Sequence, residues 1–282
     1  MAKRVTVVLS GCGAGDGSEI REAVLTLLSL ERAGAQVTWA APDVVQPGVF
    51  DHLTGAPDAQ ASPRRALVEA ARIARGAVRD LASLSANDFD GLIFPGGHGV
   101  GSVLSNYEQK GALCDVEPSV ARLMKEALAR HRPMGFICLA PILAARVLGP
   151  VAGVRVTLGP RGTTAAKNAA VMGADVRPCA ANEVFVDTRN RVISTPAYMY
   201  DDVRVTEAAQ GIEKLVRSLL QLTSDRRPAP PPPPGGRPPR SQAQPGERPG
   251  RQGPGQGRGG EGGDPIRRRR PGGPPTPARG SV

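Results

Sequence analysis

The sequence MGFICLAPILAARVL, residues 134–148, joins an apolar strand to a helix through a very short connection. The run Met134–Ile137 has the uninterrupted apolar character of a buried parallel strand. Pro141 is favoured in the first turn of a helix, so this stretch predicts a helix over 141–148. Cys138 is therefore expected on a tight strand-to-helix turn, which forces its side chain outward from the end of the strand.

The alternation of strand and helix continues along the chain. Apolar, β-branched runs predict further strands at 5–9, 36–41, 89–94 and 154–158, and 183–187 with 192–195 reads as a hairpin. Apolar residues at helical spacing predict helices from Ser18 to Gly34, from Ser62 to Gly76, and over 116–130, 165–172 and 203–222. This order predicts an α/β fold, in which a mostly parallel sheet is covered by helices on both faces.

A ligand site in such a sheet lies beyond the carboxyl ends of the strands. Four segments should meet there: 10–19, 95–101, 138–141 and 195–198. The glycine-rich loop 11–17 has neither the glycine spacing of a dinucleotide fingerprint nor the lysine of a phosphate-binding loop. It is therefore interpreted as a tight strand-to-helix loop.

Cys138 is the strongest candidate for a catalytic residue. The start of a helix lowers the pKa of a nearby thiol and so increases its thiolate fraction. Gly96 and Gly97, at the end of a neighbouring strand, can offer backbone N–H groups to an oxyanion. The alternative is a small buried apolar residue, the commoner role of a free cysteine. Position and flanking residues favour the nucleophile.

Three further residues are weaker candidates. Glu19, in the first turn of a predicted helix, either compensates the helix dipole or serves as a general acid/base, and the sequence favours neither. Cys12 lies in the glycine loop, where it can contact substrate or act as a transient redox partner. His98 follows the Gly96–Gly97 turn and is either a proton shuttle or a solvated polar residue.

The other features of the folded part point away from metal and membrane. The four Cys and three His residues show no metal-ligand spacing and no CxxC pair, so no zinc site or disulfide framework is predicted. The apolar run near the N-terminus is too short for a secretory signal or a membrane span. We therefore expect a cytoplasmic protein without metal or cofactor and without a membrane contact.

The net charge of +10 comes almost wholly from the last 57 residues. Residues 226–282 contain 12 Arg and 3 acidic residues, together with 16 Pro and 14 Gly, whereas residues 1–225 are nearly neutral. This composition predicts a disordered tail after one folded domain of residues 1–225. Its arginines allow weak, salt-sensitive contact with nucleic acid or an acidic surface, and a tail without function is the equal alternative.

Several motifs, in order and at compatible spacing, resemble one family. They are VVLSGCGAGDGSEIREAVLTLL, the stretch from HLTG through EAARIARG, LIFPGGHGVGSVLSN, GFICLAP and STPAYM. Over about residues 3–223 the chain resembles the ElbB group of PfpI-like proteins, within the class I glutamine amidotransferase-like superfamily. The resemblance implies a flavodoxin-like three-layer sandwich and a homodimer.

The resemblance also implies residue roles. It maps a nucleophile onto Cys138, an acid in contact with the thiol onto Glu19, and oxyanion donors onto the backbone of Gly97 and Leu139. Related enzymes convert methylglyoxal or glyoxal to hydroxy acids without glutathione or metal. Leu139 stands where amidotransferase and protease relatives have His, which argues against glutamine hydrolysis, and His98 stands where the ElbB pattern commonly has Phe.

We therefore expect a cofactor-independent glyoxalase-type enzyme. Cys138 would attack a small α-oxoaldehyde substrate and Glu19 would move the protons. The oxyanion would lie among Gly96, Gly97 and Leu139, and His98 and Cys12 would line the substrate site. The alternative is a non-enzymatic redox-sensing protein that uses a low-pKa Cys138.

Overall fold

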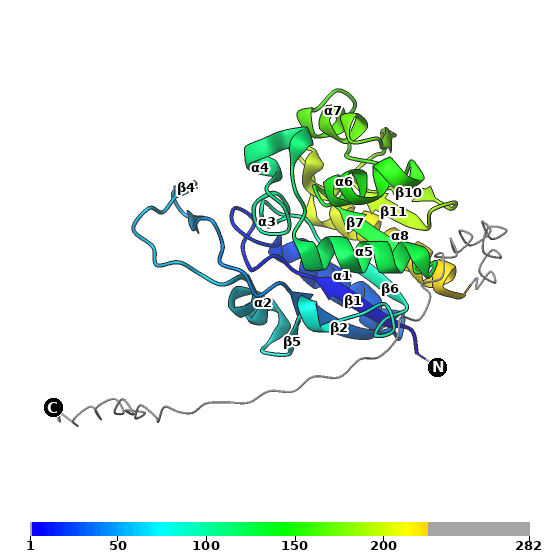
Figure 1. Cartoon of the computed structure of the whole chain (residues 1–282), viewed down its shortest axis with the longest axis horizontal. Coiled ribbons are helices and arrows are strands. Elements are labelled where there is room, and N and C mark those ends of the chain that lie inside the picture. Colours follow the sequence, from blue (N-terminus) through cyan, green and yellow to red (C-terminus); the bar gives the residue numbers. More distant parts are fainter. Residues whose placement is uncertain (1, 225–282) are drawn as a thin grey trace, which may run out of the picture. The chain divides into compact units, whose positions relative to one another are not determined.

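A computed structural model describes residues 2–224 and contains a seven-stranded central sheet (Figure 1). The strand order is β10–β11–β7–β6–β1–β2–β5, and every neighbouring pair is parallel except β10 with β11. The strands are β1 (Arg4–Val8), β2 (Gln36–Ala41), β5 (Val78–Asp80), β6 (Gly91–Phe94), β7 (Met134–Ile137), β10 (Phe185–Asp187) and β11 (Val192–Thr195). The predicted α/β fold is confirmed.

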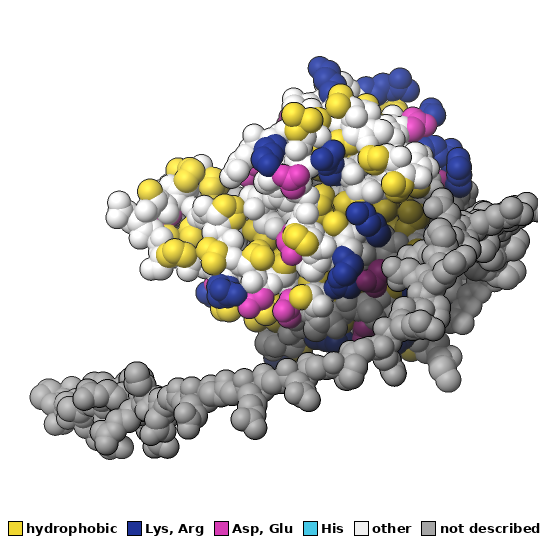
Figure 2. All heavy atoms as spheres, viewed as in Figure 1, with side chains coloured by type: hydrophobic (Ala, Val, Ile, Leu, Met, Phe, Trp, Pro, Cys, Tyr) yellow, Lys and Arg dark blue, Asp and Glu magenta, His cyan; other side chains and the backbone are white. Residues whose placement is uncertain are grey.

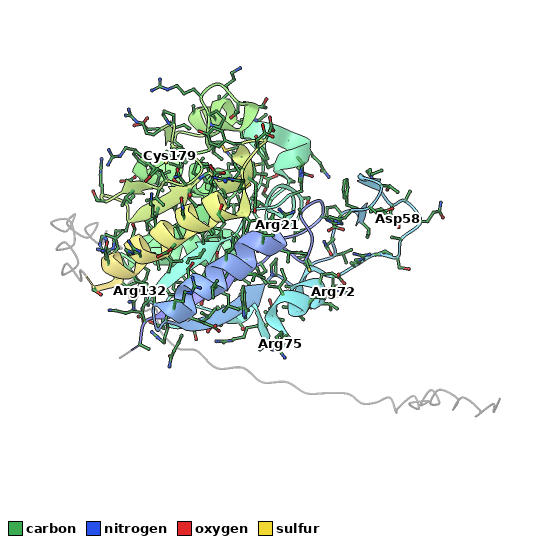
Figure 3. All side chains as sticks on the ribbon, turned by 180° about the vertical axis from the view of Figure 1, so that it is seen from behind. Arg21, Asp58, Arg72, Arg75, Arg132 and Cys179 are labelled. Atoms are coloured by element: carbon green, nitrogen blue, oxygen red, sulfur yellow. The ribbon has the colours of Figure 1, made fainter. Side chains whose placement is uncertain are left out.

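Helices cover both faces of this sheet. The α-helices of the described residues are α1 (Ile20–Arg32), α2 (Ala66–Ala74), α3 (Gly99–Ser102), α4 (Tyr107–Lys110), α5 (Pro118–Ala129), α6 (Pro141–Ala152), α7 (Thr164–Val171) and α8 (Val205–Ser224). Figure 3 shows α1 and α8 side by side across one face, and Figure 1 shows α5 and α6 in front of the other. Along β1, Val7 packs toward α1 and α8 whereas Val8 packs toward the opposite layer, which explains the unbroken apolar run.

The topology brings the predicted site segments to one edge. Strands β11, β7, β6 and β1 are consecutive in the sheet, and all four run in the same direction. Their carboxyl ends lead into the segments that begin at Ser10, Pro95, Cys138 and Pro196. The convergence expected from the sequence is therefore present.

Several boundaries differ from the predictions. Helix α1 is capped by Glu19 rather than Ser18, because the Ser18 hydroxyl accepts a hydrogen bond from the Ser10 N–H at 2.8 Å. Helix α2 begins at Ala66 rather than near Ser62, because a bridge from Val45 to Arg65 keeps that stretch extended. The strand expected at 154–158 is the short β8 (Arg155–Val156), which pairs with β9 (Asp175–Val176) outside the central sheet.

No helix or strand was predicted for residues 44–61, between β2 and α2. This segment carries the antiparallel pair β3 (Phe50–Asp51) and β4 (Ala56–Pro57) and projects from the sheet (Figure 1). Figure 2 shows hydrophobic side chains on the face of this projection that is turned to the viewer. We call residues 44–65 the projecting segment.

The predictions for residues 226–282, disorder and contact with nucleic acid or an acidic surface, lie outside the described residues. The domain boundary at residue 225 also stays a prediction. Within residues 2–224, none of the helices combines the length and apolar character needed to cross a membrane.

Candidate active site

Cys138 occupies a tight turn between β7 and α6. Its φ of 59° lies in the left-handed region that residues other than glycine rarely adopt. The Cys138 N–H donates to the carbonyl of Thr195 at 2.9 Å, and the Ala140 N–H donates to the carbonyl of Ile137 at 3.0 Å. These hydrogen bonds hold the half-buried side chain at the end of the strand, as the sequence predicted.

The carboxyl group beside this thiol belongs to Glu22 on α1. Glu22 is fully buried, and its Oε2 accepts a hydrogen bond from the Gly96 N–H at 2.7 Å. Its Oε1 is buried as well, and among the described residues no donor meets it in ideal hydrogen-bond geometry. The carboxyl also interacts with the Cys138 thiol and with the Tyr198 N–H. A buried carboxyl in contact with a thiol is suited to proton transfer at that sulfur.

Glu19 does not fill the position expected for it. Its Oε2 accepts a hydrogen bond from the Glu22 N–H at 2.7 Å and so caps α1, while its Oε1 lies 3.9 Å from Nε of Arg21. Because α1 begins at Ile20, its inward face carries Glu22, Thr26 and Leu30. The contact predicted between Glu19 and the thiol is corrected to Glu22. A glutamate in register with buried positions four and eight residues later was the signal that sequence reasoning missed.

Burial dominates the protonation of both groups. Desolvation, followed by the nearby Glu19 carboxylate, raises the pKa of Glu22 to about 8. Desolvation and then the charge of Glu22 raise the pKa of Cys138 well above its ordinary value, although the Leu139 and Gly97 N–H groups lower it. The expected low thiol pKa is therefore wrong for the resting protein, since loss of solvation outweighs the favourable backbone dipoles.

Backbone N–H groups from two turns lie close to the Cys138 sulfur. The N–H groups of Gly97 and Leu139 both interact with the Cys138 sulfur. A Cβ on Gly96 would lie 2.5 Å from Cβ of Cys138 and 2.8 Å from Oε2 of Glu22, so only glycine fits there. Gly97 has a φ of 98°, which also favours glycine. The role expected for Gly96, Gly97 and Leu139, to bind an oxyanion, stays a prediction.

Tyr198 borders the site from the segment after β11. The guanidinium carbon of Arg21 lies 5.5 Å from the centre of the Tyr198 ring, and Figure 3 shows Arg21 on α1. The Tyr198 hydroxyl is buried, which raises the pKa of Tyr198, and it interacts with the Arg21 side chain, which lowers that pKa less strongly. The segment 195–198 was expected at the site, but neither Tyr198 nor Arg21 was singled out from the sequence.

His98 and Cys12 lie in other surroundings. The His98 Nδ1 is 2.7 Å from Oε1 of Glu108, and this hydrogen bond raises the pKa of His98. Burial raises the pKa of the Cys12 thiol, and the next strongest influence on it is Glu69 of α2. Within the described chain, no contact joins either residue to Cys138. Their expected place in the substrate site is not tested by these contacts.

The functional groups at this site are suited to acid–base and nucleophilic chemistry. Across residues 2–224, no cluster of three or more His, Cys, Asp and Glu side chains is placed to hold a metal ion. What the site does assemble is a thiol, a carboxyl group that holds its proton near neutral pH, and two backbone N–H groups directed at the sulfur. This set can add a thiolate to a carbonyl and then transfer protons at the adduct.

The chain is similar to several known proteins, although no family model matches it. It is 42% identical over 230 residues to the human glutamine amidotransferase-like class 1 domain-containing protein 3, mitochondrial, which covers 79% of this chain and 84% of that protein. It is 34% identical over 236 residues to the zebrafish ES1 protein, mitochondrial, and this match covers 78% of this chain and 86% of that protein. Among solved structures, an isoprenoid biosynthesis protein with an amidotransferase-like domain from Ehrlichia chaffeensis matches with a TM-score of 0.73 and 33% identity. That match covers 78% of this chain and 99% of the bacterial one.

These relatives contradict one expectation from the sequence. The human, rat and zebrafish proteins are all named as mitochondrial, whereas the sequence was interpreted as cytoplasmic. That interpretation rested on the short apolar run near the N-terminus, and the length of such a run has no bearing on targeting to mitochondria. The cytoplasmic assignment is withdrawn.

Proposed function

We propose that this chain, which belongs to the family of glutamine amidotransferase-like class 1 domain proteins and ES1 proteins, is a glyoxalase-type enzyme for small α-oxoaldehydes. The narrower assignment to the ElbB group is part of this proposal. The observation that carries it is the closeness of Cys138 and the buried Glu22 carboxyl on either side of Gly96, together with the interactions of the thiol with Glu22 and with two backbone N–H groups. Neither step of the chemistry calls for a metal or an organic cofactor.

The first step adds the thiol to the aldehyde. Glu22, whose pKa of about 8 lies below that of Cys138, ionises first, and its carboxylate takes the thiol proton as substrate binds, which leaves one negative charge on the sulfur. The sulfur forms a bond to the aldehyde carbon as the carbonyl π bond breaks, and the carbonyl oxygen takes the proton of Glu22. The product is a hemithioacetal beside a Glu22 carboxylate, and the Gly97 and Leu139 N–H groups stabilise the developing oxyanion.

The second step is an isomerisation within the adduct. The Glu22 carboxylate removes the hydrogen from the carbon bound to sulfur, and the electron pair moves onto the neighbouring ketone to give an enediolate. Glu22 returns that proton to the former ketone carbon, and the hydroxyl proton passes to the adjacent oxygen, which leaves a thioester. Water then cleaves the thioester to a hydroxy acid and the free thiol, so the net change is addition of water to the oxoaldehyde.

Two alternatives are less well supported. Glutamine hydrolysis by a cysteine nucleophile calls for an adjacent base such as histidine, and no His is among the strongest influences on the Cys138 thiol. The redox-sensing alternative needs a thiol of low pKa, because the thiolate is the form that is oxidised readily. Burial and Glu22 instead raise the pKa of Cys138. The raised pKa favours a thiol that is activated only as substrate binds.

The test is lactate formation from methylglyoxal without glutathione or metal. We expect turnover by the wild type, and loss of about 100-fold or more in kcat for Cys138→Ala and for Glu22→Gln, because each removes a group that reacts directly. Glu31→Gln is the matched control, since it changes an exposed glutamate at the far end of the same helix. No wild-type lactate, or equal activity in Glu22→Gln and the wild type, would refute the proposal.

A further inference from the structure

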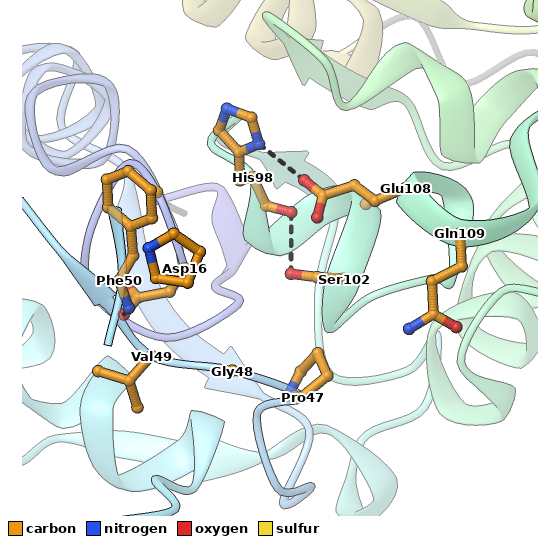
Figure 4. Close-up of a pocket in the computed structure, with 12 residues that line it drawn as sticks. Asp16, Pro47, Gly48, Val49, Phe50, His98, Ser102, Glu108 and Gln109 are labelled. Carbon is orange, nitrogen blue, oxygen red and sulfur yellow. Dashed lines mark hydrogen bonds and ion pairs between the residues drawn. The ribbon is translucent and has the colours of Figure 1, made fainter. Parts of the chain in front are cut away.

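A hollow of about 360 Å³ opens beside the turn that contacts Cys138. One side comes from the projecting segment, with Pro47, Val49 and Phe50, and Figure 4 shows Glu108 and Gln109 across from them. The hollow is of the size at which small-molecule sites begin, and most of its surface is apolar. Cys138 and Glu22 do not line it, so the chemistry derived above makes no use of it.

The hollow is joined to the reactive site through the backbone. Gly97 directs its N–H at the Cys138 sulfur, and the next residue, His98, lines the hollow. The His98 N–H donates to the carbonyl of Ala14 at 2.8 Å, which fixes the glycine loop against the same turn. Because successive Cα atoms are about 3.8 Å apart, the wall of the hollow begins one residue from an oxyanion donor.

The walls are held in place by specific contacts. His98 and Glu108 are joined by the 2.7 Å hydrogen bond, and Glu108 reaches His98 across Gly101, where a Cβ would come within 2.8 Å of its Cγ. On the other side, Phe50 lies directly on Gly15, and its N–H donates to Oδ2 of Asp16 at 2.9 Å.

The size of the hollow exceeds what methylglyoxal needs. Beyond its two carbonyl groups methylglyoxal carries only a methyl group, whereas a cavity of about 150 Å³ already accepts a benzene ring. We infer that the hollow binds the non-reacting substituent of the oxoaldehyde, and that this substituent is an aromatic or similarly bulky apolar group. The inference rests on the proposed function for the reaction itself and adds a substrate class to it.

The experiment compares two oxoaldehydes that differ only in this substituent, methylglyoxal and phenylglyoxal. Gly48 lines the hollow, and a Cβ on it meets nothing within 4 Å, so Gly48→Leu adds bulk without a clash inside the protein. Gln109→Trp adds bulk from the opposite side. Ala59→Leu is the control, because it adds apolar bulk to an exposed position of the projecting segment that does not line the hollow.

We expect both filling variants to lower kcat/KM for phenylglyoxal by about tenfold or more and to leave methylglyoxal within about twofold of the wild type. The control should leave both substrates unchanged. A parallel loss with both substrates would overturn the inference, because the variants would then act on the reactive site. Unchanged use of phenylglyoxal in both filling variants would overturn it as well.

A failure of the proposed function is distinguishable from a failure of this inference. If the wild type turns over neither aldehyde, the reaction is refuted, and binding of mandelate, the hydroxy acid that phenylglyoxal would yield, still tests the hollow. Calorimetric titration should then show mandelate binding that is lost in Gly48→Leu and kept in Ala59→Leu. Absence of binding to the wild type, or equal binding to all three proteins, would overturn the inference.

Discussion

Glu22 and Cys138 form a pair in which the negative charge of either group opposes ionisation of the other. With Glu22 protonated, the thiolate loses its largest electrostatic opponent and keeps the N–H groups of Gly97 and Leu139. With Glu22 ionised, the same thiolate would face a buried carboxylate. The competent state is therefore the one with a single negative charge on the pair, which is what the first chemical step requires.

The buried Glu22 makes folding stability depend on pH. Its pKa rises from an ordinary 4.5 to about 8 in the folded protein, so the folded state binds this proton more tightly than the unfolded state. The stability from Glu22 is complete below pH 4.5 and is lost as the pH rises to about 8. Urea unfolding should show the wild type losing on the order of a few kcal/mol over this range relative to Glu22→Gln. The same pH dependence in both proteins would contradict the raised pKa.

The negative charge of Glu19 should have a measurable effect on the pKa of Glu22. Glu19 raises the pKa of Glu22, so Glu19→Gln should lower that pKa and move the pH profile of kcat/KM toward lower pH. Glu31→Gln, at the exposed far end of α1, should leave the profile in place. The profiles are measured with methylglyoxal at constant ionic strength. A shift toward higher pH in Glu19→Gln, or an equal shift in both variants, would show that Glu19 does not act through its charge.

The sequence allowed the thiol to be predicted but not its partner. Cys138 and Leu139 are recognisable because a strand and a helix start are separated by almost nothing, which leaves one orientation for the side chain. The acid depends on where α1 begins, since each residue turns a helix by about 100°. Moving the start from Ser18 to Ile20 turns Glu19 into a cap and Glu22 into the inward carboxyl.

At the scale of elements, the site forms where the segment that follows β6 lies between α1 and the turn after β7 that holds Cys138. Gly96 accepts the Glu19 N–H at its carbonyl, at 2.9 Å, and donates its own N–H to Glu22. This one residue, two positions after β6, thereby sets the distance between the helix that carries the acid and the turn that carries the thiol. Because Gly96 has no side chain, Cys138 and the Glu22 carboxyl can approach each other.

Adding a single methyl group there should separate them. In Gly96→Ala the new Cβ would overlap Cβ of Cys138, so we expect lactate formation to fall by about 100-fold and the free energy of unfolding by about 1–3 kcal/mol. Gly48→Ala, where a Cβ meets open space, should stay within about 0.5 kcal/mol of the wild type. Chemical denaturation and the lactate assay measure the two effects. Full activity in Gly96→Ala would show that the close approach is dispensable.

Element prediction succeeded where one apolar pattern was long enough to be unambiguous. Gln36–Ala41 and Met134–Ile137 were located to the residue: all of Met134–Ile137 is buried, and Gln36–Ala41 ends in three buried residues. The edge strand β5 and the pair β3–β4 have only two or three residues each, too few to show a period of two. The projecting segment, and with it one wall of the hollow, was therefore not foreseen.

The described body of the molecule leaves one apolar stripe uncovered. Ile20, Val24 and Leu28 are 45%, 49% and 40% exposed, and their spacing of four residues aligns them along one side of α1. Glu22 and Leu30 point the other way, into the core. An antiparallel two-fold pairing centred on Val24 would place Ile20 of each copy against Leu28 of the other, so the stripe is complementary to itself.

The homodimer implied by the family resemblance stays a prediction, and this stripe is where we expect the second copy. Val24→Asp would place a charge at the centre of the pairing, so size-exclusion chromatography with light scattering should show a dimeric wild type and a monomeric variant. Val68→Asp is the matched control, because Val68 is 59% exposed on α2, outside the stripe. A monomeric wild type would contradict the dimer itself. A Val24→Asp protein that stays dimeric would place the contact on another surface.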